Sequence, residues 1–340
     1  MKWPPLLNYS SITDDQMEFS NEMLVASLPR FTDSFVAVNG INIHYVRGGS
    51  GPTIVLLSGW PLTWWAYHKI MPLLAKSFDV IAVDLRGMGN SDRPSGGYDK
   101  KTMAADIAAI VKKLDLGTVH LAGHDIGAMV AFSFAANYPD QVAKLILFDA
   151  MHPEESLYQL SIIPAYDNFD GENLNPAAPY LWWWAFQQVK VLPDLLLKGR
   201  VHLLHDWFFN NTLVNTGSID AFDRSVYNQN YKRRDSIRAT NAWFQAFSQD
   251  VEDQKSYSPL QLPVLGIAGL SYDWMNAVLP GKVTNLTMVK AENSAHHPAD
   301  EETEATAQWI ADFLNYYKYF KNGGTEMIDI LTARGTSKPI

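Results

Sequence analysis

The chain has 340 residues, 47% of them hydrophobic and 19% charged, and its 36 acidic and 27 basic residues give a net charge of −9. This composition is typical of a globular protein with one large domain or two smaller ones, and the acidic balance argues against a nucleic-acid partner. The absence of cysteine excludes disulfides, cysteine-ligated metal centres and a thiol nucleophile.

Targeting and membrane signals are absent from the sequence pattern. No stretch approaches the roughly 18 apolar residues that a membrane span requires. The first residues also lack the apolar run, about 7–15 residues long, of a secretory signal. We therefore expect a cytoplasmic protein without a membrane partner.

The first half of the chain reads as strands that alternate with helices. Residues 1–32 show weak periodicity and are expected to form an N-terminal arm, and Ser34–Arg47 alternates around Asn39-Gly40, which predicts a hairpin. Helical periodicity follows at Thr102–Leu114 and Gly127–Tyr138. Four near-continuous apolar runs predict strands covered on both faces, namely Thr53–Leu57, Asp79–Asp84, Thr118–Ala122 and Lys144–Phe148.

The second half contains a segment of different character. Residues 151–258 are rich in aromatic and amide side chains and show helix-like runs without strand alternation. Strand patterns then return at Pro263–Ala268 and Leu286–Val289, before a long amphipathic helix at Glu302–Tyr319. This order predicts an α/β fold, with a mostly parallel sheet, helices on both faces and an inserted helical cap. The expected division is an arm at 1–32, a core at 33–150 and 259–320, a cap at 151–258 and a tail at 321–340.

The motif with the clearest chemistry is Gly123-His124-Asp125-Ile126-Gly127, which follows a predicted strand and opens a predicted helix. Its glycines permit the tight turn of a nucleophile elbow, which lifts one side chain above the sheet edge. Here that side chain is an aspartate, already ionised near neutral pH. A carboxylate can displace a leaving group at saturated carbon and form an ester, which an activated water must then hydrolyse.

Three further motifs accompany the elbow, at Ser58–Pro61, Asp84–Asp92 and Ser294–His297. With them the chain, over roughly residues 33–318, resembles the α/β-hydrolase superfamily, and within it the epoxide hydrolases and haloacetate dehalogenases that use an Asp nucleophile. The resemblance implies no cofactor. It departs from the family at Ser58, where a histidine is usual.

The resemblance also implies the other groups of the site. His296 aligns with the catalytic base, and His297 is the neighbouring alternative. The acid that orients the base matches Asp149, while Asp273 is the rival, because many relatives carry the acid after a later strand. The oxyanion hole is expected to consist of two backbone N–H groups, those of Trp60 and Ile126.

The cap is where the sequence fits the epoxide hydrolases least well. That family usually places tyrosines, or a histidine and a tyrosine, on the cap to donate to the epoxide oxygen. Phe244 stands at one such position and Trp183 at the other, so Trp183 or Trp184, with Tyr227 or Tyr231, are the remaining donor candidates. The residues expected to bind substrate are Trp183, Trp184, Trp243, Phe244 and Tyr231.

These residues favour an epoxide hydrolase with a hydrophobic substrate. Carbon–halogen cleavage is the alternative, because Trp184 matches a halide-binding tryptophan, although Ile126 stands where haloacetate dehalogenases carry an arginine. A ligand-binding member without turnover is the third hypothesis, motivated by Phe244 and Ser58. The expected partners are a small hydrophobic substrate and water, in a monomer or homodimer.

Overall fold

The computed structural model describes residues 19–166, 168–170, 173–175 and 180–316. The predicted tail at 321–340, most of the predicted arm and the last residues of the predicted helix at Glu302–Tyr319 lie outside these ranges. Among the helices of the described residues, none has the length and apolarity to cross a membrane.

An eight-stranded sheet forms the centre of the molecule, in the order β1-β2-β4-β3-β5-β6-β9-β10. The β1–β2 and β2–β4 pairs are antiparallel and the remaining pairs are parallel. The strands are β1 (Phe31–Val38), β2 (Ile41–Gly49), β3 (Thr53–Leu57), β4 (Asp79–Val83), β5 (Val119–His124), β6 (Val142–Phe148), β9 (Leu260–Ala268) and β10 (Val283–Lys290). The mostly parallel α/β sheet expected from the sequence is confirmed.

The hairpin at the sheet edge follows from its turn residues. Asn39 and Gly40 both have positive φ, 49° and 79°, and they join Val38 to its partner Ile41. Two residues with positive φ form the turn whose twist matches that of the flanking strands, which is why Asn-Gly is favoured there. The hairpin therefore forms where the sequence predicts it, with longer strands.

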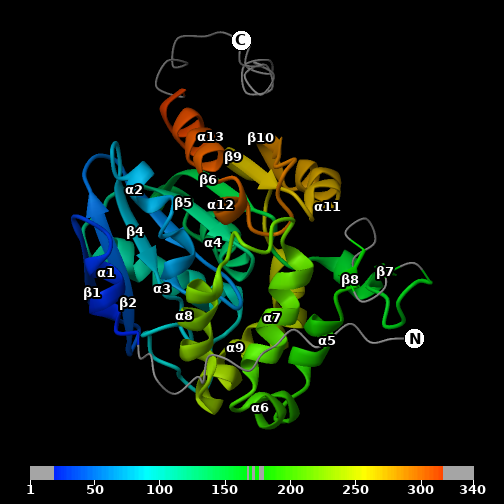
Figure 1. Ribbon diagram of the computed structural model, residues 1–340. Coiled ribbons are helices and arrows are strands. Elements are labelled where there is room, and N and C mark those ends of the chain that lie inside the picture. The colour runs from blue at the N-terminus through cyan, green and yellow to red at the C-terminus, as the bar shows by residue number, and fades with distance from the viewer. Residues whose placement is uncertain (1–18, 167, 171–172, 176–179, 317–340) are drawn as a thin grey trace, which may run out of the picture.

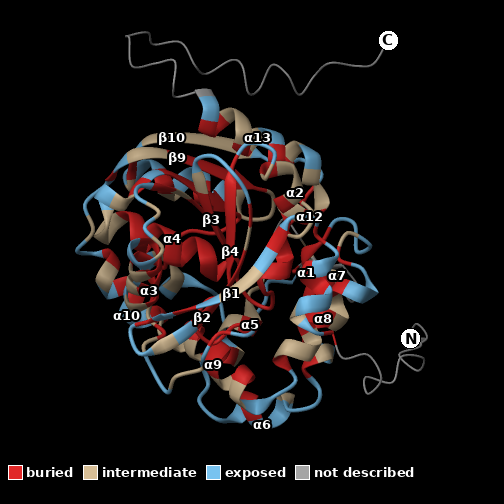
Figure 2. Ribbon diagram, turned by 90° about the vertical axis from the view of Figure 1, so that its left-hand side faces the viewer, coloured by how far each residue is buried: buried red, intermediate tan, exposed pale blue. Residues whose placement is uncertain are grey.

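Helices cover both faces of the sheet, so the central strands are buried on each side. Figure 2 shows α3 (Lys100–Lys113) and α4 (Ile126–Asn137) on one side, with α2 (Met71–Leu74) and α12 (Pro298–Glu301) on the other. All five residues of β4 are buried. The remaining helices of this part are α1 (Asn21–Ala26), α11 (Tyr272–Val278) and α13 (Thr303–Tyr316), with short 3-10 turns η1 (Trp64–Tyr67), η2 (Pro139–Gln141) and η4 (Leu279–Gly281).

Between β6 and β9 the chain leaves the sheet and forms a mainly helical segment, grouped in the lower half of Figure 1. After the 3-10 turn η3 (Glu155–Gln159), its helices are α5 (Trp182–Gln188), α6 (Leu192–Leu197), α7 (Val201–Thr212), α8 (Ala221–Tyr231), α9 (Arg234–Gln245) and α10 (Phe247–Gln254). The segment also contains one pair of very short strands. Residues Phe169–Asp170 (β7) and Asn173–Leu174 (β8) form a short antiparallel pair, too short to show alternation.

We retain as a proposal the division into a core at 33–150 and 259–320 and a cap at 151–258. Two observations refine the predicted arm: α1 lies within it, and β1 begins at Phe31, just inside its boundary. The backbone of Phe19, the first described residue, exchanges two hydrogen bonds with the side-chain amide of Gln229 in α8 (2.8 and 2.9 Å). The described chain therefore begins against a helix of the cap.

Candidate active site

Asp125 lies in the turn between β5 and α4, with φ 52° and ψ −122°. An L-residue rarely adopts positive φ, and such strain persists only where the surroundings enforce it. The neighbouring glycines make the turn possible, because a Cβ on Gly123 would overlap the backbone of Gly127, and one on Gly127 would overlap the Leu57 carbonyl. The elbow expected from the sequence is thus built by close backbone packing.

The two oxygens of the Asp125 carboxylate have different surroundings. Oδ1 accepts the Trp60 backbone N–H at 2.9 Å, and the backbone N–H of Ile126 also donates to the carboxylate. Oδ2 faces Nε2 of His296 at 3.6 Å. Burial alone would raise the pKa of Asp125, but the nearby charge of His296, with the Ile126 N–H, lowers it below the ordinary value. The carboxylate is therefore ionised and held in one orientation.

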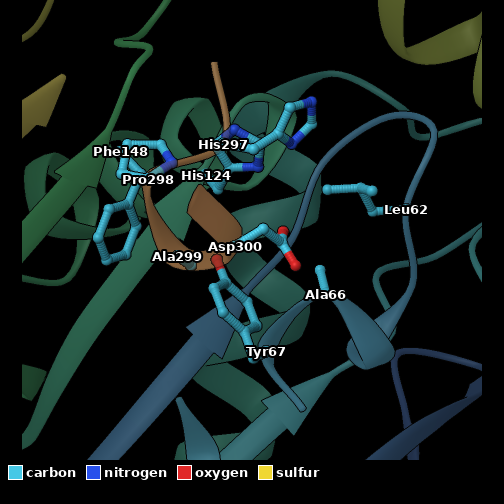
Figure 3. A pocket seen from close by; sticks show the side chains of 9 residues that line it. All are labelled: Leu62, Ala66, Tyr67, His124, Phe148, His297, Pro298, Ala299 and Asp300. Atoms are coloured by element: carbon cyan, nitrogen blue, oxygen red, sulfur yellow. The ribbon is translucent and has the colours of Figure 1, made fainter. Parts of the chain in front are cut away.

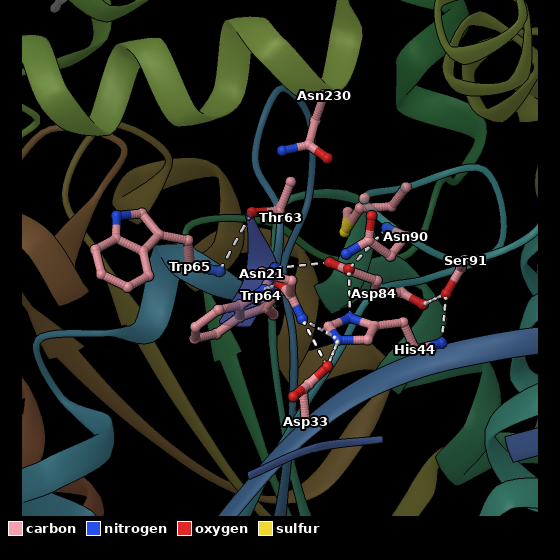
Figure 4. Close-up of polar contacts among 12 residues, drawn as sticks. Asn21, Asp33, His44, Thr63, Trp64, Trp65, Asp84, Asn90, Ser91 and Asn230 are labelled. Atoms are coloured by element: carbon pink, nitrogen blue, oxygen red, sulfur yellow. Dashed lines mark hydrogen bonds and ion pairs between the residues drawn. The ribbon is translucent and has the colours of Figure 1, made fainter. Parts of the chain in front are cut away.

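The loop that carries Trp60 is fixed by polar contacts on both sides. Ser58, which replaces the usual histidine, donates its hydroxyl to the Thr63 carbonyl at 2.9 Å. Asp84 accepts the backbone N–H of Trp64 at 2.8 Å and contacts His44 Nδ1 at 2.8 Å, as Figure 4 shows. The Asp84–Asp92 segment thus orients the loop that supplies an N–H to Asp125.

His296 stands between two carboxylates. Its Nδ1 lies 2.6 Å from Asp149 Oδ2, and the other Asp149 oxygen accepts the backbone N–H groups of Gly269 (2.9 Å) and Ser271 (2.8 Å). Asp273, the rival acid, lies exposed in the first turn of α11. The structure brings Asp149, and not Asp273, to the histidine.

The two carboxylates control the protonation of His296. Burial would lower the pKa of this imidazole, but the charge of Asp125, together with the hydrogen bond to Asp149 and its charge, outweighs burial and raises it to about 10. His297 and His124 are buried nearby without such partners, and burial is the main reason that the pKa of each is lowered, for His124 to about 3. His296 is therefore the imidazolium of this cluster, whereas His297 and His124 stay neutral.

A cavity of about 360 Å³ opens beside Asp125 and His296. It is bounded by Asp125, Asp149, Ala150, Ser156, Leu157, Gln159, Leu160, Leu181, Trp183, Trp184, Thr212, Leu270, Ser271, Trp274 and His296. Within the described part of the chain, the only ionisable side chains on this wall are Asp125, Asp149 and His296, and no tyrosine belongs to it. The cavity suits a neutral, largely apolar molecule.

Three residues expected to bind substrate do not line this cavity. The Trp243 indole N–H donates to the Arg86 carbonyl at 3.1 Å, and the Tyr231 hydroxyl donates to the Leu62 carbonyl at 2.8 Å. Phe244 packs behind the wall, with ring centroids 6.0 Å from Trp60 and 6.5 Å from Trp184. The three side chains pack in the interior of the fold, and their role in binding substrate stays a prediction. Tyr227, the other tyrosine considered as a donor, is also buried and does not line the cavity.

Several lining residues were missed by the sequence analysis. Thr212 ends α7, and its carbonyl accepts the His296 backbone N–H at 3.0 Å. Trp274 follows the rival Asp273 and donates its indole N–H to Ser156 at 3.3 Å. Leu270 and Ser271 directly follow β9, and the carboxyl end of a parallel strand is where site residues gather in open α/β sheets. Their place just after this strand is the one feature of the sequence that could have identified them.

A second, smaller cavity lies beside His297 and Asp300. Its volume of about 10 Å³ is about the least that can hold one water molecule. Figure 3 shows the Tyr67 hydroxyl and the Asp300 carboxylate turned toward a common space, with His297 and His124 above them. Within the described structure the buried Nδ1 of His297 has no hydrogen-bond partner. Burial raises the pKa of Asp300 to about 7, despite its contact with Lys69.

Residues 52–277 match a family model described as the alpha/beta hydrolase fold. A soluble epoxide hydrolase of Corynebacterium sp. (strain C12) is 46% identical over 112 residues, covering 33% of this chain and 39% of that protein. A fluoroacetate dehalogenase of Burkholderia sp. is 27% identical over 84% of this chain and 94% of that protein. The crystal structure of wild-type Cfl2 from Burkholderia cenocepacia superposes with a TM-score of 0.76 at 34% identity, over 84% of this chain and 96% of that chain.

Proposed function

Because the chain belongs to the α/β-hydrolase family, we propose that it hydrolyses neutral, hydrophobic epoxides through an ester on Asp125. The observation that carries the proposal is the asymmetry of the Asp125 carboxylate. Oδ1 is bound by the backbone N–H of Trp60, and Oδ2 lies beside His296, available for attack. The similarity to an epoxide hydrolase supports the same assignment.

In the first step Asp125 Oδ2 forms a bond to an epoxide carbon, and the carbon–oxygen bond of the ring breaks with its electron pair on oxygen. The indole N–H groups of Trp183 and Trp184 in the cavity wall are available to donate hydrogen bonds to this oxygen. Esterification removes the charge of Asp125, so the pKa of His296 falls from about 10. The imidazolium then gives its proton, through a water, to the alkoxide.

In the second step neutral His296 removes a proton from water, and the oxygen of that water attacks the ester carbon of Asp125. Negative charge develops on Oδ1, where the N–H groups of Trp60 and Ile126 stabilise it. The ester bond breaks to release the diol and restore the carboxylate. One water proton leaves on the alcohol and the other stays on His296 beside Asp149, which restores the starting state.

The wall of the cavity supports a neutral substrate. Ile126, the residue after the nucleophile, is apolar and fully buried. No cation lines the described cavity apart from His296, whose charge is already balanced by two carboxylates. A substrate carboxylate would therefore be buried without a partner, which is costly.

Replacing His296 by glutamine tests this proposal, because attack by Asp125 should survive while ester hydrolysis stops. Mass spectrometry of H296Q mixed with aromatic epoxides should show a protein adduct equal in mass to the intact epoxide. D125N, lacking the nucleophile, should form no adduct. If H296Q binds the epoxides but forms no adduct with any of them, the ester mechanism is wrong.

Carbon–halogen hydrolysis is the second candidate, favoured by the donors in the cavity. The described wall has indoles and no tyrosine, and a halide leaves as an anion that needs a hydrogen bond but no proton. With a neutral haloalkane, H296Q should then gain the mass of the alkyl group without halogen, with one equivalent of halide released. Adducts from haloalkanes and none from epoxides would favour this candidate over the first.

A further inference from the structure

One carboxylate, that of Glu301, joins the cap to the segment that carries His296. Glu301 ends α12, five positions after His296. Its Oε1 accepts the backbone N–H groups of Val214 (2.6 Å) and Asn215 (2.9 Å), which follow α7. Its Oε2 accepts the Ala295 backbone N–H (2.8 Å) and the Ser294 hydroxyl (3.0 Å). Four donors from two distant segments thus converge on one side chain.

The same two segments meet at His296 itself. The His296 backbone N–H donates to the carbonyl of Thr212, the last residue of α7, at 3.0 Å. Thr212 also lines the large cavity. The position of the base is therefore set from both sides of the residue, by Thr212 directly and by Glu301 through Ala295.

The preceding residue, Asp300, makes a second tie. Its Oδ1 lies 3.0 Å from Lys69 Nζ, and Lys69 also contacts the Ser218 carbonyl and Asp223 Oδ2 (3.5 Å) in the cap. The Trp65 indole N–H, from the turn after the Trp60 loop, donates to the other Asp223 oxygen at 2.7 Å. Both acids of α12 are thus engaged with segments that seat the cap.

We propose that Glu301 is a positioning residue that makes the seating of the cap set the position of His296, and so controls hydrolysis of the ester without controlling its formation. This inference rests on the proposed function, because only an ester mechanism has two separable steps. The nucleophile is oriented by the N–H groups of Trp60 and Ile126, which Glu301 does not contact in the described structure. Displacement of His296 should therefore slow hydrolysis of the ester, while attack by Asp125, which precedes the proton transfer from His296, should keep its rate.

The test is single-turnover kinetics of Glu301→Gln with an epoxide that gives an adduct with H296Q. The amide keeps one acceptor oxygen but turns its NH2 group toward two donors, so the hydrogen bonds to one of the two segments are lost. We expect ester formation at the wild-type rate and ester hydrolysis slower by about tenfold, the scale of a small misplacement of a catalytic group. The alkylated protein should then accumulate in the mass spectrum.

Glu302→Gln is the matched control. Glu302 binds the backbone and side-chain amide of Asn293 (3.3 and 3.1 Å) in the same loop and makes no hydrogen bond to a described residue of the cap. Both rates should stay at the wild-type value in this variant. Equal slowing of both steps in E301Q, or no slowing of either, would overturn the positioning role.

The two proposals fail differently. An adduct in H296Q without accumulation in E301Q removes the role of Glu301 and leaves the ester mechanism in place. No adduct in either variant removes the ester mechanism itself. If E301Q does not fold, Glu301→Asp serves instead, because it keeps the charge but is one methylene too short to reach both segments. It should show the same selective loss of ester hydrolysis.

Discussion

At the scale of single residues, the site is a row of alternating charges. The carboxylates of Asp125 and Asp149 flank the His296 imidazolium, at 3.6 and 2.6 Å. All three groups are buried, so each charge is stabilised mainly by its neighbour and little by water. In the proposed mechanism, esterification removes the charge of Asp125 and so lowers the affinity of the imidazole for its proton. Protonation of the base is in this way coupled to the progress of the reaction.

Asp125→Asn imitates that loss of charge without any substrate. We expect the pKa of His296 to fall below about 10, because one of the two carboxylates that raise it has become neutral. A pH titration of the imidazole nitrogens by ¹⁵N NMR measures the shift. Asp273→Asn, at the exposed rival acid, should leave the pKa of His296 unchanged. A His296 pKa still near 10 in D125N would contradict this account of the charge row.

The residue types of the site could be predicted from sequence to different extents. Asp125 and His296 stand in local motifs, so the residues next to them in the sequence are enough to identify them. The choice between Asp149 and Asp273 stayed open, because it depends on the turn after β6, where Asp149 adopts φ 44° and meets the N–H groups after β9. Those donors are 120 residues or more away along the chain, so no local pattern records them.

At the scale of elements, the strand–turn–helix unit around Asp125 is the part with least tolerance. Gly127 packs so closely on β3 that a Cβ would overlap the carbonyls of Leu57 and Ser58. Ile126, whose N–H binds the nucleophile, precedes it directly. The first turn of α4 must therefore lie against the end of β3 for stability and, in the proposed mechanism, for the oxyanion hole.

Gly127→Ala tests this packing. We expect the free energy of unfolding to fall by about 3 kcal/mol, because the methyl group forces the helix away from the strand. Ester formation should also slow, since the Ile126 N–H moves with the helix. Gly96→Ala is the control: nothing lies within 4 Å of the place that its methyl group would take, and its stability should change by about 0.5 kcal/mol or less. Chemical denaturation of the two variants supplies the comparison, and equal stability of the two would refute the packing argument.

Strands and helices whose own residues show a clear hydrophobic pattern were predicted best. β3 has the predicted bounds Thr53–Leu57, because a parallel strand buried on both faces is a continuous apolar run between turns. The rotation of α9 could not be predicted, and so the sequence did not indicate that Trp243 and Phe244 lie outside the cavity lining. That rotation is set by packing against α5 and α6, which involves side chains tens of residues away.

At the scale of the whole molecule, the large cavity lies between the sheet core and the cap, so the cap must be held in one place. Lys69 contributes one contact, because it pairs with Asp223 of the cap and with Asp300 of α12. Lys100, the first residue of α3, makes another: its Nζ lies 2.8 Å from Asp250 Oδ2 of α10 and donates to the Trp243 carbonyl at 2.7 Å. Both side chains of the Lys100–Asp250 pair are fully buried. No sequence pattern marked this pair, because its members are 150 residues apart.

Replacing Lys100 alone, and then Lys100 and Asp250 together, tests whether the balance of two buried charges holds the cap in place. Lys100→Met alone leaves the Asp250 carboxylate buried without a partner, and we expect a loss of about 3–5 kcal/mol in the free energy of unfolding. The double variant K100M/D250L replaces both charges by apolar groups and should recover most of that loss. Lys255→Met removes exposed pairs with Glu252 and Glu155 and should leave the free energy of unfolding nearly unchanged. Denaturant unfolding measures all three variants.

If the double variant is as unstable as K100M, the cap is held by the hydrogen bonds of Lys100 to Trp243 and Asp250 and not by the balance of two buried charges. Cap attachment would then depend on polar geometry, and the double variant should also lose the cavity in which Asp125 reacts.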